Sequence, residues 1–252
     1  MEDEDAKANE NAHLGNLSHP VLERFHLNRV SGCCASEIDL WVRIAVDRFV
    51  RDSKIWVFPE YGIIRLPSTL FRCENLETLE LRKVIISEVP SRVSFQSLKT
   101  FCLLFVKYPD EESFVRLISD CPVLEDLVVE TCHDDNVVTF TINVPSLEKF
   151  SVRHTLQDLE TDNDVFVVHY HSLKQLTIVD YFSELKLLGH NNKMPQLIEA
   201  NLLSVSCHAK VLESFSRLKR ISLCLPEGPI IFKPLRYYLK LAVVWFHYIT
   251  LF

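Results

Sequence analysis

Glycine is scarce in this 252-residue chain, which contains only five. They stand far apart, at positions 15, 32, 62, 189 and 228. Phosphate-binding loops of the dinucleotide and nucleoside-triphosphate types need several glycines close together, because the backbone must approach the phosphates closely. The sequence therefore contains neither type of loop.

An excess of positive charge is also lacking. The chain has 27 Lys and Arg against 34 Asp and Glu, a formal net charge of −7. Binding to nucleic acid or to an anionic membrane depends on a basic field. We therefore expect no nucleic acid partner, and a membrane partner is not favoured.

Paired cysteines and an apolar leader are absent too. None of the eight cysteines forms a C-x-x-C pair, and the one close pair, Cys33 and Cys34, is adjacent, which suits neither zinc nor an easy disulfide. The first twenty residues are acidic and polar, without the apolar run of a secretory signal. Free thiols fit a reducing compartment, so we expect the chain in the cytoplasm or the nucleus.

A repeated pattern organises most of the chain. Eight segments follow L-x-x-Φ-x-Φ, where Φ is apolar, and they recur at nearly constant steps from the second one onward. The first step is about twice as long as the others, and a degenerate unit at residues 50–55 lies near its middle. The eight segments begin at Leu22, Leu76, Leu98, Leu124, Leu147, Leu173, Leu197 and Leu218.

These steps fall within the roughly 20–29 residues that are typical of a leucine-rich repeat. Each unit has one short strand that can bury its alternate residues only against neighbouring units. The pattern predicts an α/β leucine-rich-repeat solenoid of about nine degenerate repeats, with a curved parallel sheet and an irregular convex side of helices and turns. We assign residues 1–18 to an acidic disordered tail, 19–228 to the repeats and 229–252 to an apolar tail.

The segments between the strands differ in character. Residues 36–49 carry apolar residues at helical spacing after a candidate N-cap, Ser36, and a second helix is expected to start at Asp110. Residues 66–70 and 89–93 indicate short turns. The consensus asparagine after each strand is replaced, so we expect a less regular solenoid; these positions hold Val84, Val106, Cys132, Thr155, Tyr181, Val205 and Pro226.

Several stretches resemble the plant F-box/FBD/leucine-rich-repeat proteins, over roughly residues 19 to 226. They are residues 39–51, 66–71, 108–113, 117–130, 144–147 and 194–201, of which Cys-Pro-Val-Leu-Glu-Asp-Leu at 121–127 is the most specific. Members of this family are usually substrate receptors of an SCF-type ubiquitin ligase, whose F-box docks on the Skp adaptor and whose repeats bind the protein to be modified. The resemblance implies a protein partner for the repeats, and a Skp adaptor and cullin only where an F-box is present. No F-box-like stretch precedes Pro20.

Three groups of polar residues suggest chemistry but fit structural roles better. Alternating acids at 158–164 lack the turn glycine and closing glutamate of a calcium loop. His169 and His171 offer zinc only two ligands, where three or four are needed. The triplet at 132–134 (Cys-His-Asp) is typical of a turn, and neither a G-x-S-x-G elbow nor an H-E-x-x-H pair occurs. We expect no metal, no cofactor and no catalysis.

The apolar tail allows more than one role. Its strongly apolar part, residues 239–252, is shorter than the roughly 20 residues that span a bilayer. A cap on the last repeat or a non-family extension is favoured over a membrane anchor, since a terminal repeat needs a cover.

The candidate site is the concave face of the sheet, because the strand residues that flank the fourth position of each unit point outward. We predict a protein-interaction module resembling the substrate-recognition repeats of a ubiquitin ligase; the alternative is a stand-alone binding module or a truncated remnant without ligase function. The predicted partner-binding residues are Arg24, His26, Thr78, Glu80, Thr100, Asp126, Val128, Lys149, Ser151, Gln175, Thr177, Glu199, Asn201 and Arg220.

Overall fold

Two parallel sheets and three short helices make up the described part of the protein. The structure is a computed structural model. It describes residues 21–30, 35–57, 66–131, 136–154, 164–169, 171–180, 186–189, 194–204, 215 and 217–224.

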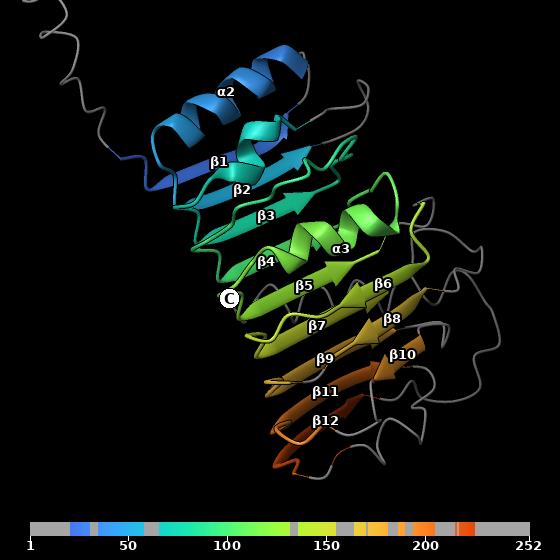
Figure 1. Cartoon of the computed structure of the whole chain (residues 1–252). Helices are drawn as coiled ribbons and strands as arrows, with labels where there is room; N and C mark the ends of the chain where they lie inside the picture. The colour runs from blue at the N-terminus through green and yellow to red at the C-terminus, as the bar shows by residue number, and fades with distance from the viewer. Residues whose placement is uncertain are drawn as a thin grey trace, which may run out of the picture.

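The main sheet has nine strands, all parallel, stacked as one column (Figure 1). Their order along the sheet follows their order along the chain, so each repeat packs on the one before it. The nine repeats expected from the sequence are therefore confirmed. The strands are β1 (Arg24–Val30), β2 (Asp52–Val57), β3 (Thr78–Arg82), β4 (Thr100–Leu104), β5 (Asp126–Glu130), β7 (Lys149–His154), β9 (Gln175–Asp180), β11 (Glu199–Ser204) and β12 (Arg220–Cys224).

Alternation of side chains explains why these segments are strands. In β3 the pattern residues Leu79 and Leu81 are fully buried, while the alternate residues Thr78, Glu80 and Arg82 are only partly buried. The degenerate unit behaves in the same way, because Ser53 and Ile55 of β2 are buried and pair in register with the pattern residues of β3. The L-x-x-Φ-x-Φ pattern thus specifies which side chains enter the core.

In the first half of the solenoid the chain returns through helices. These are α2 (Ala35–Asp47), the 3₁₀ helix η2 (Ser68–Arg72) and α3 (Glu111–Ser119). Helix α2 begins at Ala35, so Ser36 lies in its first turn and does not precede it as predicted. Helix α3 starts after Asp110, as expected, and buries Phe114, Leu117 and Ile118 against the core.

In the second half the chain returns through strands. A second parallel sheet, in the order β10-β8-β6, consists of β6 (Thr139–Ile142), β8 (Val165–Val168) and β10 (Lys186–Gly189). In Figure 1 these three strands run against the direction of the main sheet. The predicted helices and turns describe the first half of this side only, and from residue 139 onward the described return segments form a regular sheet.

Phenylalanines join the helical and the extended return segments. Phe114 of α3 meets Phe140 of β6 edge to face at 5.0 Å between ring centroids, and Phe140 stacks on Phe166 of β8 at 4.8 Å. Phe166 in turn contacts Phe150 of β7 at 6.1 Å. All four side chains are at most 1% exposed. One continuous core therefore runs through the change from helix to strand.

The turns after the strands do without the consensus asparagine. Val84 and Val106, which occupy two of those positions, are buried in the core. Their turns are held by backbone hydrogen bonds between repeats, from Lys83 N to Leu104 O at 2.9 Å and from Lys107 N to Val84 O at 3.0 Å. The other five positions lie outside the described residues.

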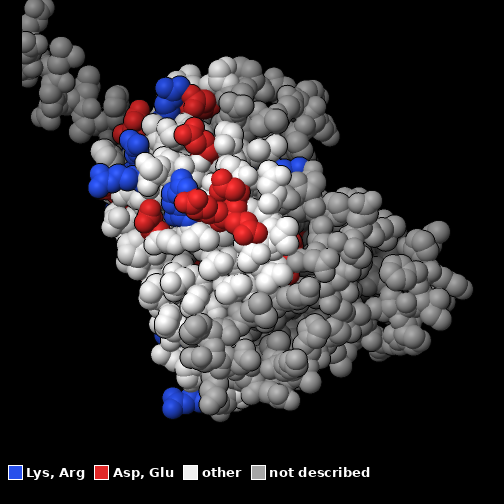
Figure 2. Space-filling model, turned by 45° about the vertical axis from the view of Figure 1, so that its right-hand side comes forward, with Lys and Arg blue, Asp and Glu red and all other residues white. Residues whose placement is uncertain are grey.

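The charged surface of the return side is mixed. Figure 2 shows acidic and basic groups interspersed on the upper part of the visible face. Two of the pairs link residues one helical turn apart, Arg43 with Asp39 in α2 and Arg116 with Glu112 in α3. No field of a single sign therefore covers the described part of this face.

Some predictions fall on segments that the structure does not describe. They concern the tails at 1–18 and 229–252, the Cys-His-Asp triplet at 132–134 and most of the acidic run at 158–164; of that run, Asp164 is described and is buried. Among the helices that are described, none has the length and apolar character needed to cross a membrane.

Candidate partner-binding face

The outward side chains of the main sheet form three ladders across the strands, and together they make what we call the outer face. The first ladder is Arg24, Asp52, Thr78, Thr100, Asp126, Lys149, Gln175, Glu199 and Arg220. The second is His26, Lys54, Glu80, Cys102, Val128, Ser151, Thr177, Asn201 and Ser222. The third is Trp56, Arg82, Leu104, Glu130, Arg153, Val179, Leu203 and Cys224.

All fourteen residues predicted from the sequence lie on the first two ladders. The parallel register places them opposite one another on neighbouring strands, about 4.8 Å apart. The structure therefore gathers into one surface residues that are spread over most of the chain, from Arg24 to Arg220. The third ladder was not predicted.

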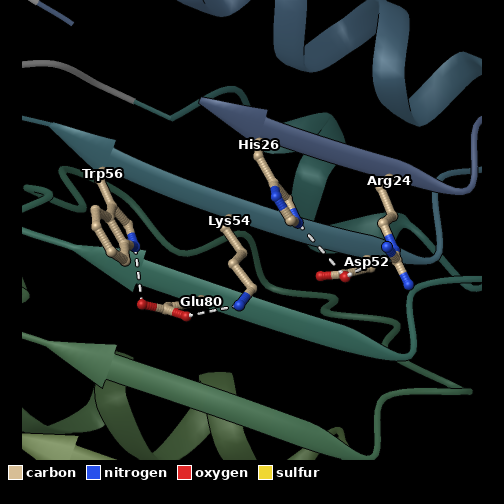
Figure 3. Close-up of polar contacts among 6 residues, drawn as sticks. All are labelled: Arg24, His26, Asp52, Lys54, Trp56 and Glu80. Atoms are coloured by element: carbon tan, nitrogen blue, oxygen red, sulfur yellow. Dashed lines mark hydrogen bonds and ion pairs between the residues drawn. The ribbon is translucent and has the colours of Figure 1, made fainter. Parts of the chain in front are cut away.

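A network of charged and aromatic side chains occupies the β1–β3 end of the outer face (Figure 3). Asp52 lies 3.7 Å from Arg24 Nε and 3.5 Å from His26 Nε2. On the next strand Glu80 lies 3.6 Å from Lys54 Nζ. Charges of opposite sign on adjacent strands thus hold one another in place.

Trp56 is the fixed aromatic of this network. Its indole Nε1 donates a 2.8 Å hydrogen bond to Glu80 Oε1, and the guanidinium carbon of Arg82 lies 5.2 Å from its ring centroid. Arg82 therefore makes a cation–π contact with the ring. Because Glu80 and Arg82 constrain it from two directions, the half-buried ring needs little reordering when a partner binds.

Strand β4 contributes only uncharged side chains to the outer face, namely Thr100, Cys102 and Leu104. Cys102 of β4 lies opposite Val128 of β5, and Leu104 follows Cys102 by two residues on β4. Burial raises the pKa of the Cys102 thiol to about 12, with a further contribution from the nearby carboxylates of Glu80 and Asp126. Cys102 is therefore a neutral thiol at physiological pH, and it lacks the thiolate that nucleophilic catalysis requires.

An ion pair also occurs at the β11–β12 end of the outer face. Arg220 donates two hydrogen bonds to Glu199 Oε2, from Nη2 at 2.7 Å and from Nε at 2.9 Å, and Gln175 donates a third at 3.2 Å. The hydrogen bonds from Arg220 lower the pKa of Glu199, with smaller help from Asn201 and Gln175. In the middle, partial burial raises the pKa of Asp126, which Lys149 opposes.

Sequence reasoning missed Asp52, Lys54, Trp56 and Arg82. Asp52, Lys54 and Trp56 belong to the degenerate unit, and Arg82 is the last outward residue of its strand, so none of the four flanks the fourth position of a regular unit. The alternation in Asp52–Val57, with its buried Ser53, Ile55 and Val57, is the signal that would have found three of the four.

The histidine pair is a local contact between two connecting residues. His169 and His171 follow β8, with their rings stacked at 6.2 Å between centroids. Within the described segments, no three His, Cys, Asp or Glu side chains come together in a group that could hold a metal ion.

Comparison with known proteins identifies the repeats. The sequence model for the leucine-rich repeats of the FBD-associated F-box protein At5g56370 matches residues 38–205, from α2 to the end of β11. The chain belongs to the F-box/FBD/leucine-rich-repeat family. The outer face from Trp56 to Asn201 is therefore built within the family's repeat region.

Three relatives from Arabidopsis thaliana illustrate the extent of the match. The F-box/FBD/LRR-repeat protein At5g56420 is 40% identical over 82% of this chain and 49% of its own length. The putative FBD-associated F-box protein At3g50710 is 34% identical over 91% of this chain and 56% of its length. The F-box/LRR-repeat protein At3g26922 is 39% identical over 82% of this chain and 67% of its length.

This F-box/FBD/leucine-rich-repeat chain thus spans about half the length of most of the relatives it matches. No solved structure matches it.

Proposed function

We propose that this chain is a protein-interaction module whose outer face binds a protein partner, in the manner of the substrate-recognition repeats of an SCF-type ubiquitin ligase. The observation that carries the proposal is Trp56, fixed by Glu80 and Arg82 on a face of nine strands. Trp and Arg are the residue types that most often dominate the binding energy of protein interfaces.

The chemistry of the outer face favours a folded protein or peptide over a polymer. It carries charges of both signs, and several are paired across strands, as in Arg24 with Asp52 and Lys54 with Glu80. A repeating polyanion would need a stripe of one sign. Uncharged side chains such as Cys102 and Val128 lie among the charged ones, and this mixture of apolar and polar groups is typical of protein interfaces.

Binding rather than catalysis is the proposed activity. The thiol of Cys102 lies on the outer face on β4, and burial, which raises its pKa to about 12, keeps it protonated. The pattern residues on the other side of the strands pack in the core, as the full burial of Leu79, Leu81 and Leu103 illustrates.

Removing the fixed aromatic tests the proposal. The double substitution Trp56→Ala with Arg82→Ala is expected to weaken partner capture at least tenfold, about 1.4 kcal/mol. The measurement is affinity purification from plant cells with quantitative mass spectrometry, followed by titration of the retained partner. Glu80 is left unchanged, because its side chain is only 15% exposed and orders both Trp56 and Lys54.

The matched control removes an apolar residue and a cation from the return side. Leu40 in α2 and Arg72 in η2 are both exposed, so Leu40→Ala with Arg72→Ala should leave capture unchanged. Equal capture by the wild type and the Trp56/Arg82 variant would contradict the proposal that the outer face binds the partner.

The same purification tests the ligase role. Recovery of the Skp adaptor and cullin in amounts comparable to the bait supports a substrate receptor. Retention of other proteins without these two favours a stand-alone binding module.

We also propose that the chain acts in the cytoplasm or the nucleus. The described cysteines Cys73, Cys102, Cys121 and Cys224 are free thiols, which suits a reducing compartment. Imaging of a fluorescent fusion in plant cells tests this, and a signal confined to secretory compartments would contradict it.

A further inference from the structure

The charges of the outer face are matched almost one to one. Its three ladders carry six Lys and Arg side chains and five Asp and Glu side chains. Each carboxylate has a cation beside it in its own ladder, on an adjacent strand, and Figure 3 shows two of these pairs. The five pairs are Arg24 with Asp52, Lys54 with Glu80, Asp126 with Lys149, Glu130 with Arg153, and Glu199 with Arg220.

Arg82 is the cation that remains without a carboxylate. Its neighbours in the third ladder are Trp56 on β2 and Leu104 on β4, and neither carries a charge. The carboxylate two residues before it, Glu80, is engaged with Trp56 Nε1 and Lys54 Nζ. Within the described part of the chain, the contact of the Arg82 guanidinium is therefore the Trp56 ring and not a hydrogen-bond acceptor.

We propose that Arg82 binds a carboxylate of the protein partner, from an Asp or Glu side chain with apolar neighbours. A guanidinium presents several N–H donors in one plane, and two of them match the two oxygens of a carboxylate. The Trp56 ring holds this group in place before the partner arrives, so little order is lost on binding. This inference rests on the proposed function, because it names what the partner presents to the outer face.

The residues around Arg82 define the rest of this chemistry. Trp56 and Leu104 are half-buried, so each offers apolar surface beside the guanidinium. Apolar side chains of the partner would cover that surface and exclude water from the ion pair, which strengthens it. A carboxylate matches the single surplus cation, whereas a phosphate group carries up to two negative charges and would lie near Glu80. An acidic side chain is therefore favoured over a phosphorylated one.

Selection from a display library of short random peptides tests the inference on the full chain. The wild type should enrich peptides that carry Asp or Glu next to apolar residues. Arg82→Met keeps a long side chain against the Trp56 ring but removes the charge, so this enrichment should be lost. Arg153→Met is the matched control: it removes from the same ladder a cation that Glu130 already offsets, and it should keep the enrichment.

A charge exchange then separates recognition from structural support. In a selected peptide, replacement of its Glu by Gln should weaken binding to the wild type about tenfold or more, the scale of a hydrogen bond to a charged group. The same replacement should change binding to Arg82→Met by less than about threefold. Arg82→Glu should reject the Glu peptide and bind its Lys version, which a residue that only supported the fold would not do. Fluorescence polarisation measures these affinities.

Three results would overturn the inference. They are enrichment of no peptide or of peptides without an acidic position, an equal effect of the Gln replacement on the wild type and Arg82→Met, and tighter binding of a phosphoserine version than of the Glu peptide. Partner capture distinguishes this failure from that of the proposed function. Capture that persists in Arg82→Met but is lost in the Trp56/Arg82 double variant would overturn the carboxylate contact alone, whereas capture that persists in both would overturn the proposed function as well.

Discussion

Three residues other than glycine hold a left-handed backbone in the described part of the chain, which is unusual for side chains of their size. They are Phe49, Lys83 and Phe105, with φ of 56°, 55° and 53°. Phe49 ends α2 in a Schellman turn, since its N–H donates to Val46 O at 2.9 Å and that of Val50 donates to Ala45 O at 3.2 Å. Lys83 and Phe105 come directly after β3 and β4. In a chain with five glycines, these turns keep a strained conformation that neighbouring hydrogen bonds impose.

The strain at Phe49 is measurable with two variants. Phe49→Gly and Phe49→Ala remove the same half-exposed ring, but only glycine relieves the left-handed conformation. The glycine variant should be the more stable of the two by about 1 kcal/mol in urea denaturation. Equal stabilities would show that this turn stores no strain.

At the scale of the element, helix α3 shows how a single side chain sets a boundary. Asp110 precedes the helix in an extended conformation, and its carboxylate accepts a 2.7 Å hydrogen bond from Ser113 N. Hydrogen bonds from the side chain and the backbone of Ser113 lower the pKa of Asp110 below its ordinary value of 3.8. The ionised form is therefore the one that caps the helix.

This cap predicts a loss of stability in acid. Because the folded-state pKa is lowered, the contribution of Asp110 is present above the ordinary pKa of 3.8 and is lost as the pH falls through the folded value. Asp110→Ala should lower the melting temperature at neutral pH. Asp110→Asn, which keeps an oxygen acceptor, should lower it less, and both differences from the wild type should shrink in acid.

Circular dichroism melts at several pH values measure this effect. A constant difference between the wild type and Asp110→Asn from pH 7 down to strongly acidic pH would contradict the role given to the carboxylate.

At the scale of the whole molecule, the solenoid is one core despite its two kinds of return segment. Residues from Ile38 in α2 to Leu202 in β11 belong to a single buried cluster. Phe140 lies where the return side changes from helix to strand, and it contacts Phe114 on one side and Phe166 on the other. Both halves should therefore depend on this ring.

Removal of that ring should destabilise the whole solenoid. Phe140→Ala is expected to lower the free energy of unfolding by about 3–5 kcal/mol, because the cavity lies between rigid repeats. Val138→Ala, two residues earlier and 52% exposed, is the control and should change it by less than about 0.5 kcal/mol. Urea titration followed by tryptophan fluorescence compares the two, and a similar small loss for both would contradict the continuity of the core.

The repeat pattern, as a local property, could be recognised without any structure. A leucine followed by apolar residues three and five positions later specifies a strand and its buried side, so that Leu76, Leu79 and Leu81 were assignable to the core before any contact was known. Even the irregular unit around Ser53 could be placed, because the spacing of its neighbours leaves room for one more strand. The fourteen predicted residues of the outer face follow from the same alternation.

The sequence by itself thus determined the number of repeats, the buried side of each strand and most of the outer face, since these depend on residues close together in the chain. The tertiary structure decided how the chain returns after residue 139 and which outward side chains meet. Thr139–Ile142 becomes a strand because Val165–Val168 lies beside it to complete its hydrogen bonds. Trp56, Glu80 and Arg82 form a group only because parallel register places residues of successive repeats on adjacent strands. Hydrogen bonds and ring contacts between repeats leave no trace in a local pattern, and they appear only once the strands are stacked.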